Sequence, residues 1–299
     1  MKRLILLVLV LAAAAAALYY SERHRQESRV GPEAVLNALA DTQRELSRVP
    51  TAMTHISAEE EVSIGNTLAE RYSIQYKTGQ YGTGDAAMQD YVTAVGRKVA
   101  GRARRKFDYK FHYVPDETLV NAFALPGGHV FIGKGLVQLI ETEDELASVL
   151  GHEVEHIDNY HCVERYQIKA HMHDLPLGEL MALPVQLFQA GYGKEQELEA
   201  DRDGTYLAVM AGYSPQGAVH LFERFKRLHH DYVLKAGSPD QELSKVAMAG
   251  IEGYFRSHPL PEERINQIER IIAAKKWTSV PERALQVHPD TLKTAAGNQ

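Results

Sequence analysis

The chain has 299 residues, enough to bury a hydrophobic core in one large domain or in two small ones. A hydrophobic content of 44% and a charged content of 24% are ordinary for globular proteins and exclude a wholly disordered chain. The net charge of −6 argues against nucleic acid as a partner, because nucleic-acid-binding proteins usually carry a surplus of basic residues. The single cysteine, Cys162, excludes an intramolecular disulfide and is expected to be a small buried hydrophobic residue.

The N-terminus has the charge pattern of an export signal. Lys2 and Arg3 precede an uncharged apolar run, residues 4–20, and polar residues follow it. A helix of that length spans about 26 Å, slightly less than a bilayer core of about 30 Å, so both a cleaved and an uncleaved segment are compatible with it. We therefore predict a signal peptide or N-terminal membrane anchor over residues 1–20. The protein is expected in the periplasm, either anchored in the inner membrane by residues 4–20 or released after signal cleavage.

The next patterns along the chain predict helices and then two strands. A stalk or first helix is expected over residues 21–56, and Ser57 with Glu60 forms a capping box where the following helix should begin. Apolar residues at helical spacing over 88–99 predict a second helix. Aromatic and polar side chains then alternate over 107–113, which predicts a half-buried strand, and a Pro-Gly-Gly turn leads into a second strand over 129–132.

The rest of the chain is predicted to be mostly helical. Thr142 and Glu145 form a second capping box, and an apolar stripe continues from there to Ile157 with helical period. Further helices are expected over 162–189, around the segment EQELEADRDG, from Ser214-Pro215 onward, and in the segment HPLPEERINQIERIIAAKK. Helices with one small sheet predict an α+β fold.

The segment GHEVEH carries the first candidate site. His152 and His156 are four residues apart, so on a helix they point the same way and can bind one zinc ion. Glu153 can reach the edge of such a site and take a proton from a water molecule, as in the HExxH pattern. By itself this five-residue pattern also occurs by chance.

A catalytic zinc ion needs a third protein ligand and an open position. A metzincin would place a histidine six residues after His156, but that position is Cys162, and His161 is interpreted as a helix-end residue. The segment ELEAD offers a glutamate from a second helix instead. Local sequence does not decide between its three carboxylates, which are Glu197, Glu199 and Asp201.

Four motifs occur in order, NAFALPGGHVFI, GHEVEH, ELEADRDG and SHPLPEERI. Together they closely resemble the gluzincin family of the CAAX-prenyl endopeptidases, the membrane protease HtpX and the periplasmic protease BepA, over roughly residues 57–274. The resemblance implies a mostly helical zincin-type metalloprotease domain over residues 57–275, followed by a C-terminal tail over 276–299. Prenylated substrates are not expected, because the multi-span membrane core of the prenyl endopeptidases has no counterpart in this sequence.

For individual residues, the resemblance implies one zinc ion per chain, with His152, His156 and Glu197 as its ligands. It assigns Asp201 to a hydrogen bond with a ligand imidazole, which fixes the tautomer of that imidazole. It also implies that the segment from Asn121 to Ile132 forms an edge strand of the small sheet, which lines the active-site cleft and along which a substrate lies. The residues expected on that edge strand are Asn121, Phe123, Gly128, His129 and Val130.

The resemblance places His258 beside the zinc cleft, with Arg264 nearby. Pro259 disfavours a helical conformation for His258, so we expect it in the loop before a helix that begins near Leu260. Three interpretations are open. His258 occupies the fourth zinc position and restrains the enzyme, or it stabilises the oxyanion of the transition state, or it only marks the start of the helix.

The leading hypothesis is an exported zinc-dependent metalloendopeptidase that hydrolyses misfolded or damaged envelope proteins, with Glu153 as general base. Its partners would be unfolded or misassembled protein substrates, and the inner membrane if the N-terminal segment is not cleaved. An alternative is a protease-like chaperone or assembly factor that binds envelope proteins with little catalysis, although binding alone has no chemical need for Glu153. A third is a helical scaffold with a chance HExxH, which metal analysis would test.

Overall fold

The computed structural model describes residues 56–172, 192–235, 254, 258, 261–278 and 280–287. The predicted N-terminal signal or anchor, the stalk up to residue 55, the helical segment over 173–189 and the end of the tail lie outside these ranges. Within the ranges, no helix is both long enough and apolar enough to cross a membrane.

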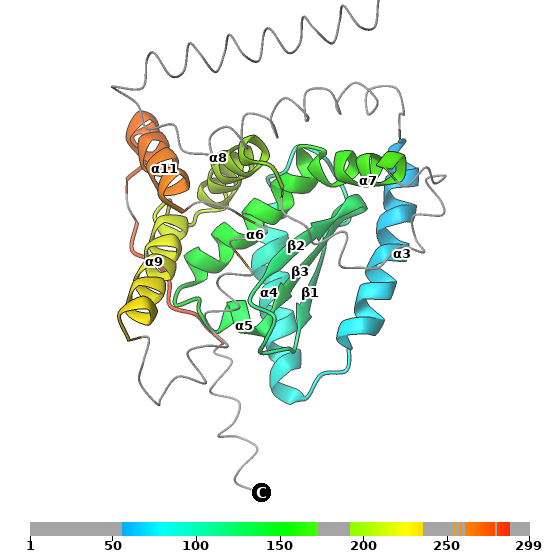
Figure 1. The fold of residues 1–299 in the computed structure, drawn as a ribbon, viewed down its shortest axis with the longest axis horizontal. Helices are drawn as coiled ribbons and strands as arrows, with labels where there is room; N and C mark the ends of the chain where they lie inside the picture. The colour runs from blue at the N-terminus through cyan, green and yellow to red at the C-terminus, as the bar shows by residue number, and fades with distance from the viewer. Residues whose placement is uncertain are drawn as a thin grey trace, which may run out of the picture. The chain divides into compact units, whose positions relative to one another are not determined.

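Helices surround one small sheet, which is the predicted α+β fold (Figure 1). The long helices are α3 (Ala58–Tyr76), α4 (Thr83–Ala100), α6 (Glu143–Asp158), α7 (His161–Met172), α8 (Lys194–Met210), α9 (Gly217–Lys235) and α11 (Pro261–Lys275). The strands are β1 (Lys110–Val114), β2 (Ala122–Leu125) and β3 (His129–Gly133), with the short helices η1 (Pro126–Gly128) and α5 (Lys134–Val137) on either side of β3.

The sheet has the order β1-β3-β2, so β3 lies in its centre. β3 pairs in parallel with β1 and antiparallel with β2, and Val130 faces Phe111 on one side and Ala124 on the other. The prediction that the whole segment 121–132 forms an edge strand is therefore wrong for His129 and Val130. In the sheet formed by the described residues, only its first half, β2 with Phe123, forms an edge, and α6 lies beside it. Gly128 belongs to the turn η1 between the two strands.

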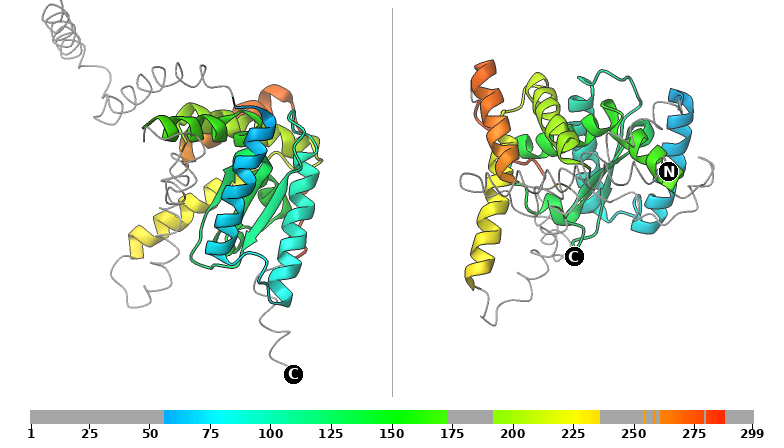
Figure 2. Two further views of the ribbon diagram at one scale, coloured as in Figure 1. Left: turned by 90° about the vertical axis from the view of Figure 1, so that its right-hand side faces the viewer. Right: turned by 45° about the horizontal axis from the view of Figure 1, so that its top comes forward.

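The two faces of the sheet contribute to two separate parts of the core. On one face, Phe123 and Phe131 stack at 5.1 Å between ring centroids and pack against Tyr72 of α3. On the other face, Val130 and Ile132 pack with residues of α4 and α6. Figure 2 shows α3 in blue and α4 in cyan running along the sheet. The alternation of side chains along β3 thus separates an α3 layer from the layer that holds α6.

Strand boundaries differ from the prediction because pairing, not alternation alone, defines a strand. β1 begins at Lys110 rather than at residue 107, since its partner β3 begins at His129, which faces Lys110. β2 was not recognised as a separate strand, because all four of its residues are buried and no polar residue alternates with them.

The structure confirms the predicted capping box at Ser57 in full and the one at Thr142 in part. Ser57 and Glu60 form the full capping box, with the Ser57 N–H donating to Glu60 at 2.9 Å and the Glu60 N–H donating to Ser57 Oγ at 3.2 Å. At α6, Thr142 Oγ1 accepts from the Glu145 N–H at 3.1 Å, but the Glu145 carboxylate accepts the N–H of Glu141 at 2.8 Å rather than that of Thr142. The same carboxylate also forms an ion pair with Arg224 of α9.

The start of α6 is bound by two distant parts of the chain. Asp144, fully buried in the first turn, accepts the N–H of Ser214 and the N–H of Arg283, each at 2.6 Å. Thr142 also forms an isolated β-bridge with Ala284. The described part of the predicted C-terminal tail is thus packed against the helix that carries GHEVEH.

Candidate metal centre

Helix α6 places two histidines and a glutamate together in the interior. His152, Glu153 and His156 are buried, and the Nε2 atoms of the two histidines lie 3.0 Å apart. Helix α8 brings Glu197 to the same point. Its Oε2 lies 3.4 Å from His152 Nε2, and its Oε1 lies 3.5 Å from His156 Nε2. Three donor groups of the type that zinc prefers therefore converge.

Two glycines allow α6 and α8 to approach this closely. A Cβ atom on Gly204 of α8 would lie 2.6 Å from the backbone N of His152, and one on Gly151 would lie 2.7 Å from the carbonyl oxygen of Gly204. Both distances are shorter than van der Waals contact. The glycines of GHEVEH and ADRDG thus bring the backbones of the two helices together next to the histidines.

The donor set fits a zinc ion. Zinc binds nitrogen and oxygen at about 2.0–2.2 Å in a tetrahedral arrangement, which separates the donor atoms by roughly 3.4 Å. The observed separations of 3.0–3.5 Å agree with that value. In addition, Glu153 Oε2 is buried without a hydrogen-bond partner in the described part of the chain. A buried carboxylate oxygen of this kind is expected to receive a partner in the working enzyme, such as a water molecule.

Of the three carboxylates in ELEAD, only that of Glu197 faces both histidine Nε2 atoms. Glu199 instead contacts His161 and Arg202. Asp201 accepts from His152 Nδ1 at 2.9 Å, on the side of the ring away from Nε2. This is the arrangement that the resemblance implied, although the ligand assignment itself stays a prediction.

Arg264 of α11 completes the surroundings of Asp201. Its Nε and Nη2 donate to the two carboxylate oxygens of Asp201 at 2.6 and 2.7 Å. Burial alone would raise the pKa of Asp201, but the Arg264 guanidinium and the His152 hydrogen bond outweigh burial and hold that pKa below its usual value. Asp201 is therefore a fixed negative partner for the His152 imidazole.

Burial acts differently on the two glutamates at the centre. It raises the pKa of Glu153, because the effect of burial outweighs the opposite effects of His258 and His152. For Glu197, burial also favours the neutral acid, but His258 and His152 outweigh it and hold the pKa of Glu197 well below its usual value. The pKa values of two neighbouring carboxylates are thus shifted in opposite directions, a pattern typical of catalytic sites.

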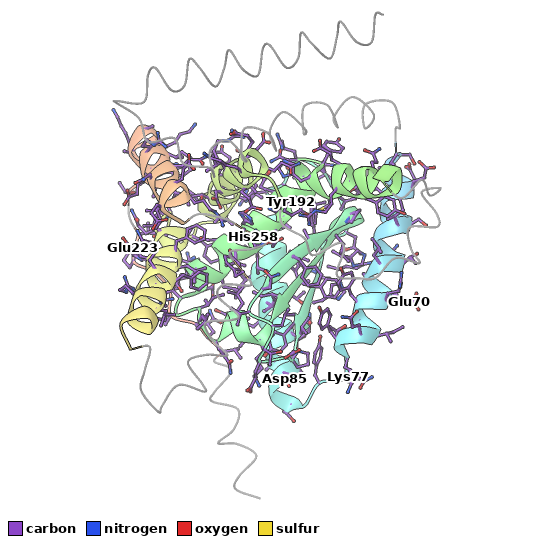
Figure 3. All side chains as sticks on the ribbon, in the orientation of Figure 1. Glu70, Lys77, Asp85, Tyr192, Glu223 and His258 are labelled. Carbon is purple, nitrogen blue, oxygen red and sulfur yellow. The ribbon has the colours of Figure 1, made fainter. Side chains whose placement is uncertain are left out.

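His258 is the fourth member of the group, in which one ligand atom from each residue lies within 4.8 Å of the others. Its Nδ1 lies 3.0 Å from Glu197 Oε2 and 3.3 Å from His152 Nε2. Its Nε2 lies 3.5 Å from the carbonyl oxygen of Ala122, the first residue of β2. Figure 3 shows His258 beside α6. The imidazole therefore lies between the candidate ligands and the edge strand.

Sequence reasoning missed two aromatic residues around the site. Tyr192 stacks on the ring of His156 with 3.6 Å between ring centroids and 14° between planes, and its hydroxyl lies 3.2 Å from Cys162 Sγ. Tyr254 packs against His258 at 4.8 Å between centroids. Neither residue had a local signal in the sequence. Tyr192 stands between two glycines, which indicated only a turn. Cys162 is buried as predicted, and burial raises its pKa to about 12.

The other residues expected along a substrate strand lie in different surroundings. The side chain of Phe123 packs on the α3 face of the sheet, so Phe123 can meet a peptide at the strand edge only through its backbone. His129 is buried on that same face, with Nδ1 3.0 Å from His112 Nε2 and Nε2 3.0 Å from Asn66 Oδ1. Its imidazole is therefore engaged away from the metal centre.

Comparison with known proteins identifies the family. The model of peptidase family M48 matches residues 86–272, which include the whole candidate centre. The chain belongs to peptidase family M48. This confirms the gluzincin resemblance and the predicted enzyme class, a zinc metallopeptidase.

Several known proteins are similar to this chain at modest identity. The beta-barrel assembly-enhancing protease of Yersinia pestis is 27% identical over 203 residues, which cover 61% of this chain and 38% of that protein. The protein of the same name from Escherichia coli is 24% identical over 233 residues, 70% of this chain and 44% of that protein. The mitochondrial metalloendopeptidase OMA1 of Arabidopsis thaliana is 30% identical over 126 residues, 40% of this chain and 26% of that protein. The chain thus matches less than half the length of each of these three relatives.

Proposed function

We propose that the chain is an exported zinc-dependent metalloendopeptidase that hydrolyses peptide bonds in misfolded or damaged envelope proteins. The observation that carries this proposal is the convergence of His152, His156 and Glu197 beside a buried oxygen of Glu153 that has no hydrogen-bond partner among the described residues. One zinc ion per chain fits this donor set, and all four groups are shielded from solvent.

Zinc held by these three residues would lower the pKa of a water molecule to about 7 and polarise the scissile carbonyl group. Glu153 performs the proton transfers: its carboxylate takes a proton from the attacking water and later gives it to the leaving amine. Burial raises the pKa of Glu153, which makes the protonated form accessible between the two transfers. Asp201 and Arg264 orient His152 throughout.

The edge strand β2 supports an extended peptide as substrate. An edge strand offers unpaired backbone groups to which a substrate segment can add as a further strand. Only a locally unfolded chain can present such a segment, which favours misfolded or unassembled proteins as substrates. The names of the bacterial relatives, which refer to beta-barrel assembly, agree with a substrate from the envelope.

For His258 we propose a gating role. Its Nδ1 lies within 3.3 Å of both His152 Nε2 and Glu197 Oε2, as expected for a group that takes the fourth ligand position. A zinc site with four protein ligands is closed to water and substrate. In this proposal the imidazole must leave before hydrolysis can begin, so His258 restrains the enzyme until a substrate arrives.

Export to the periplasm is part of the same proposal. It is supported by Lys2 and Arg3 ahead of the apolar run over residues 4–20, since positive charges stay on the cytoplasmic side. Whether residues 4–20 anchor the protein in the inner membrane or are removed can be tested by N-terminal sequencing of the protein from fractionated cells. A full-length chain in the cytosolic fraction would contradict export.

The test of the catalytic proposal compares the wild type with Glu153→Gln. Glutamine is nearly isosteric but cannot accept the proton, so we expect one zinc ion per chain in both proteins and casein hydrolysis only in the wild type. Hydrolysis by the variant close to the wild-type rate would contradict the general-base role. Equal zinc content with no hydrolysis by either protein, together with suppression of casein aggregation by both, would favour the chaperone alternative.

A further inference from the structure

The two candidate ligand histidines are supported in different ways. His152 contacts a carboxylate directly, since its Nδ1 lies 2.9 Å from Asp201 Oδ1. His156 contacts another imidazole, since its Nδ1 lies 3.0 Å from His161 Nδ1. The second nitrogen of His161, Nε2, lies 3.3 Å from Glu199 Oε2. A chain of polar contacts therefore leads from the metal centre through His161 to a glutamate whose side chain is 42% exposed.

Only one distribution of protons satisfies this chain of contacts when His156 binds a metal. Metal binding through Nε2 leaves the proton of His156 on Nδ1, which then acts as a donor. Nδ1 of His161 must accept that hydrogen bond, so the proton of His161 lies on Nε2. That N–H in turn points at the Glu199 carboxylate, which can only accept. Each contact thus pairs one donor with one acceptor.

The backbone between α6 and α7 is shaped to make the contact. α6 ends at Asp158, and Tyr160 adopts a left-handed conformation with φ of 64°, which is rare for a residue other than glycine. α7 starts directly after this turn at His161, whose imidazole contacts His156, five residues earlier. Tyr192 stacks on the face of the His156 ring, so the ring is fixed both on its face and at its Nδ1 edge.

We propose that His161 and Glu199 are positioning residues for the metal site, forming a histidine–carboxylate relay that holds His156 with Nε2 directed at the metal. The inference rests on the proposed function, because it assumes that His156 is a zinc ligand. It gives a role to His161, which was interpreted from the sequence as a helix-end residue. It also gives a role to Glu199, whose carboxylate does not face the two histidine Nε2 atoms.

Zinc affinity of the full-length protein tests the relay, measured by competition with a chromogenic chelator. His161→Leu should weaken zinc binding about 10–100-fold, the usual effect of losing a hydrogen-bond partner behind a ligand histidine. His161→Gln should recover part of that loss, because its amide oxygen can accept from His156 Nδ1. Glu199→Leu removes the acceptor of the His161 N–H and should weaken binding by less than His161→Leu, because His161 can still accept from His156. Glu195→Leu, the same change on an exposed glutamate of α8, is the matched control and should bind like the wild type.

Thermal melting of the metal-free proteins separates positioning from a structural role. Unchanged melting of His161→Gln and Glu199→Leu, together with weaker zinc binding, supports the relay. Wild-type affinity in His161→Leu, or equal affinity in His161→Gln and His161→Leu, overturns it. If His161→Leu does not fold, the decision falls to the glutamate pair, and equal affinities of Glu199→Leu and Glu195→Leu overturn the relay.

The relay and the proposed function fail in different ways. If the wild type binds no zinc, or if His156→Ala binds zinc as tightly as the wild type does, the proposed function is wrong. If the wild type binds one zinc ion, His156→Ala loses it and the His161 variants keep it, only the relay is wrong.

Discussion

Arg264 donates to both carboxylate oxygens of Asp201, from Nε at 2.6 Å and from Nη2 at 2.7 Å, and both side chains are buried. A two-point contact of this kind is among the stronger interactions between side chains. Replacing Arg264 by Met would leave the Asp201 carboxylate buried without its guanidinium. We expect a loss of about 3–5 kcal/mol in the free energy of unfolding, as found when one partner of a buried ion pair is removed.

Urea denaturation of the metal-free protein measures this loss. Arg270→Met is the matched control, since Arg270 is exposed on the same helix, α11. If the two variants have the same stability, the Arg264–Asp201 pair does not stabilise the fold as described.

The choice of Glu197 as third ligand predicts different effects for neighbouring glutamates. Glu197→Ala should remove most of the zinc, because Glu197 is the only ELEAD carboxylate that faces both His152 Nε2 and His156 Nε2. Glu199→Ala should retain one zinc ion per chain at saturating metal, with reduced affinity. Elemental analysis after gel filtration measures the metal content. Full zinc content in Glu197→Ala and none in Glu199→Ala would mean that Glu199, and not Glu197, is the zinc ligand on α8.

The gating role of His258 predicts a gain of activity on mutation. His258→Ala should raise the rate of casein hydrolysis several-fold, because the fourth position near Glu197 and His152 opens to water and substrate. A role in stabilising the oxyanion predicts the opposite sign, a fall of about 10²–10³ in kcat. A rate equal to that of the wild type would contradict both roles. Zinc content, measured on the same samples, shows whether a change in rate reflects a change in metal.

The His112–His129 pair under α3 predicts a loss of stability in acid. Burial, followed by the charge of Lys110, lowers the pKa of His112 to about 4, and burial, followed by His112 and Lys110, lowers the pKa of His129 to about 3. In the unfolded chain both histidines have the ordinary pKa of 6.5. Between pH 6.5 and the lowered pKa values of the folded protein, the unfolded chain therefore binds more protons than the folded chain. Stability therefore falls as the pH falls below 6.5.

His129→Gln tests this, since glutamine can still donate to Asn66 and accept from His112. The stability lost between pH 7 and pH 5 should be smaller than in the wild type by about 1–2 kcal/mol, the contribution of one depressed histidine over this range. Chemical denaturation at both pH values measures it. An identical pH dependence in the two proteins would show that His129 does not titrate below its ordinary range.

The part of the site that lies on one helix could be predicted from the sequence. His152, Glu153 and His156 share one helical face because of the helical period, and all residues of α6 are buried, so this face lies in the interior. The distance to Glu197 could not be predicted in the same way. It depends on the contact between Gly151 and Gly204, and neither segment contains a local pattern that predicts that the two helices meet there.

The sheet shows the same limit of local reasoning. Alternation predicted β1 because one of its faces is partly polar, whereas β2 is buried on both faces and carries no such pattern. The position of β3 between β1 and β2 follows from a parallel pairing, which requires a connection across the sheet that the residues of β3 do not indicate. His129 and Val130 were therefore assigned to the wrong position.

The anchoring of Asp144 has a consequence for the order of events during synthesis. Its two backbone partners, Ser214 and Arg283, follow it by 70 and 139 residues. A nascent chain that has been translated only as far as the ELEAD segment already contains His152, His156 and Glu197, but the start of the helix that carries both histidines is not yet fastened. Both backbone contacts of Asp144 can form only when Arg283 has become available. The helix that carries both histidines therefore gains its full set of backbone anchors only after residues far beyond the ELEAD segment have been made.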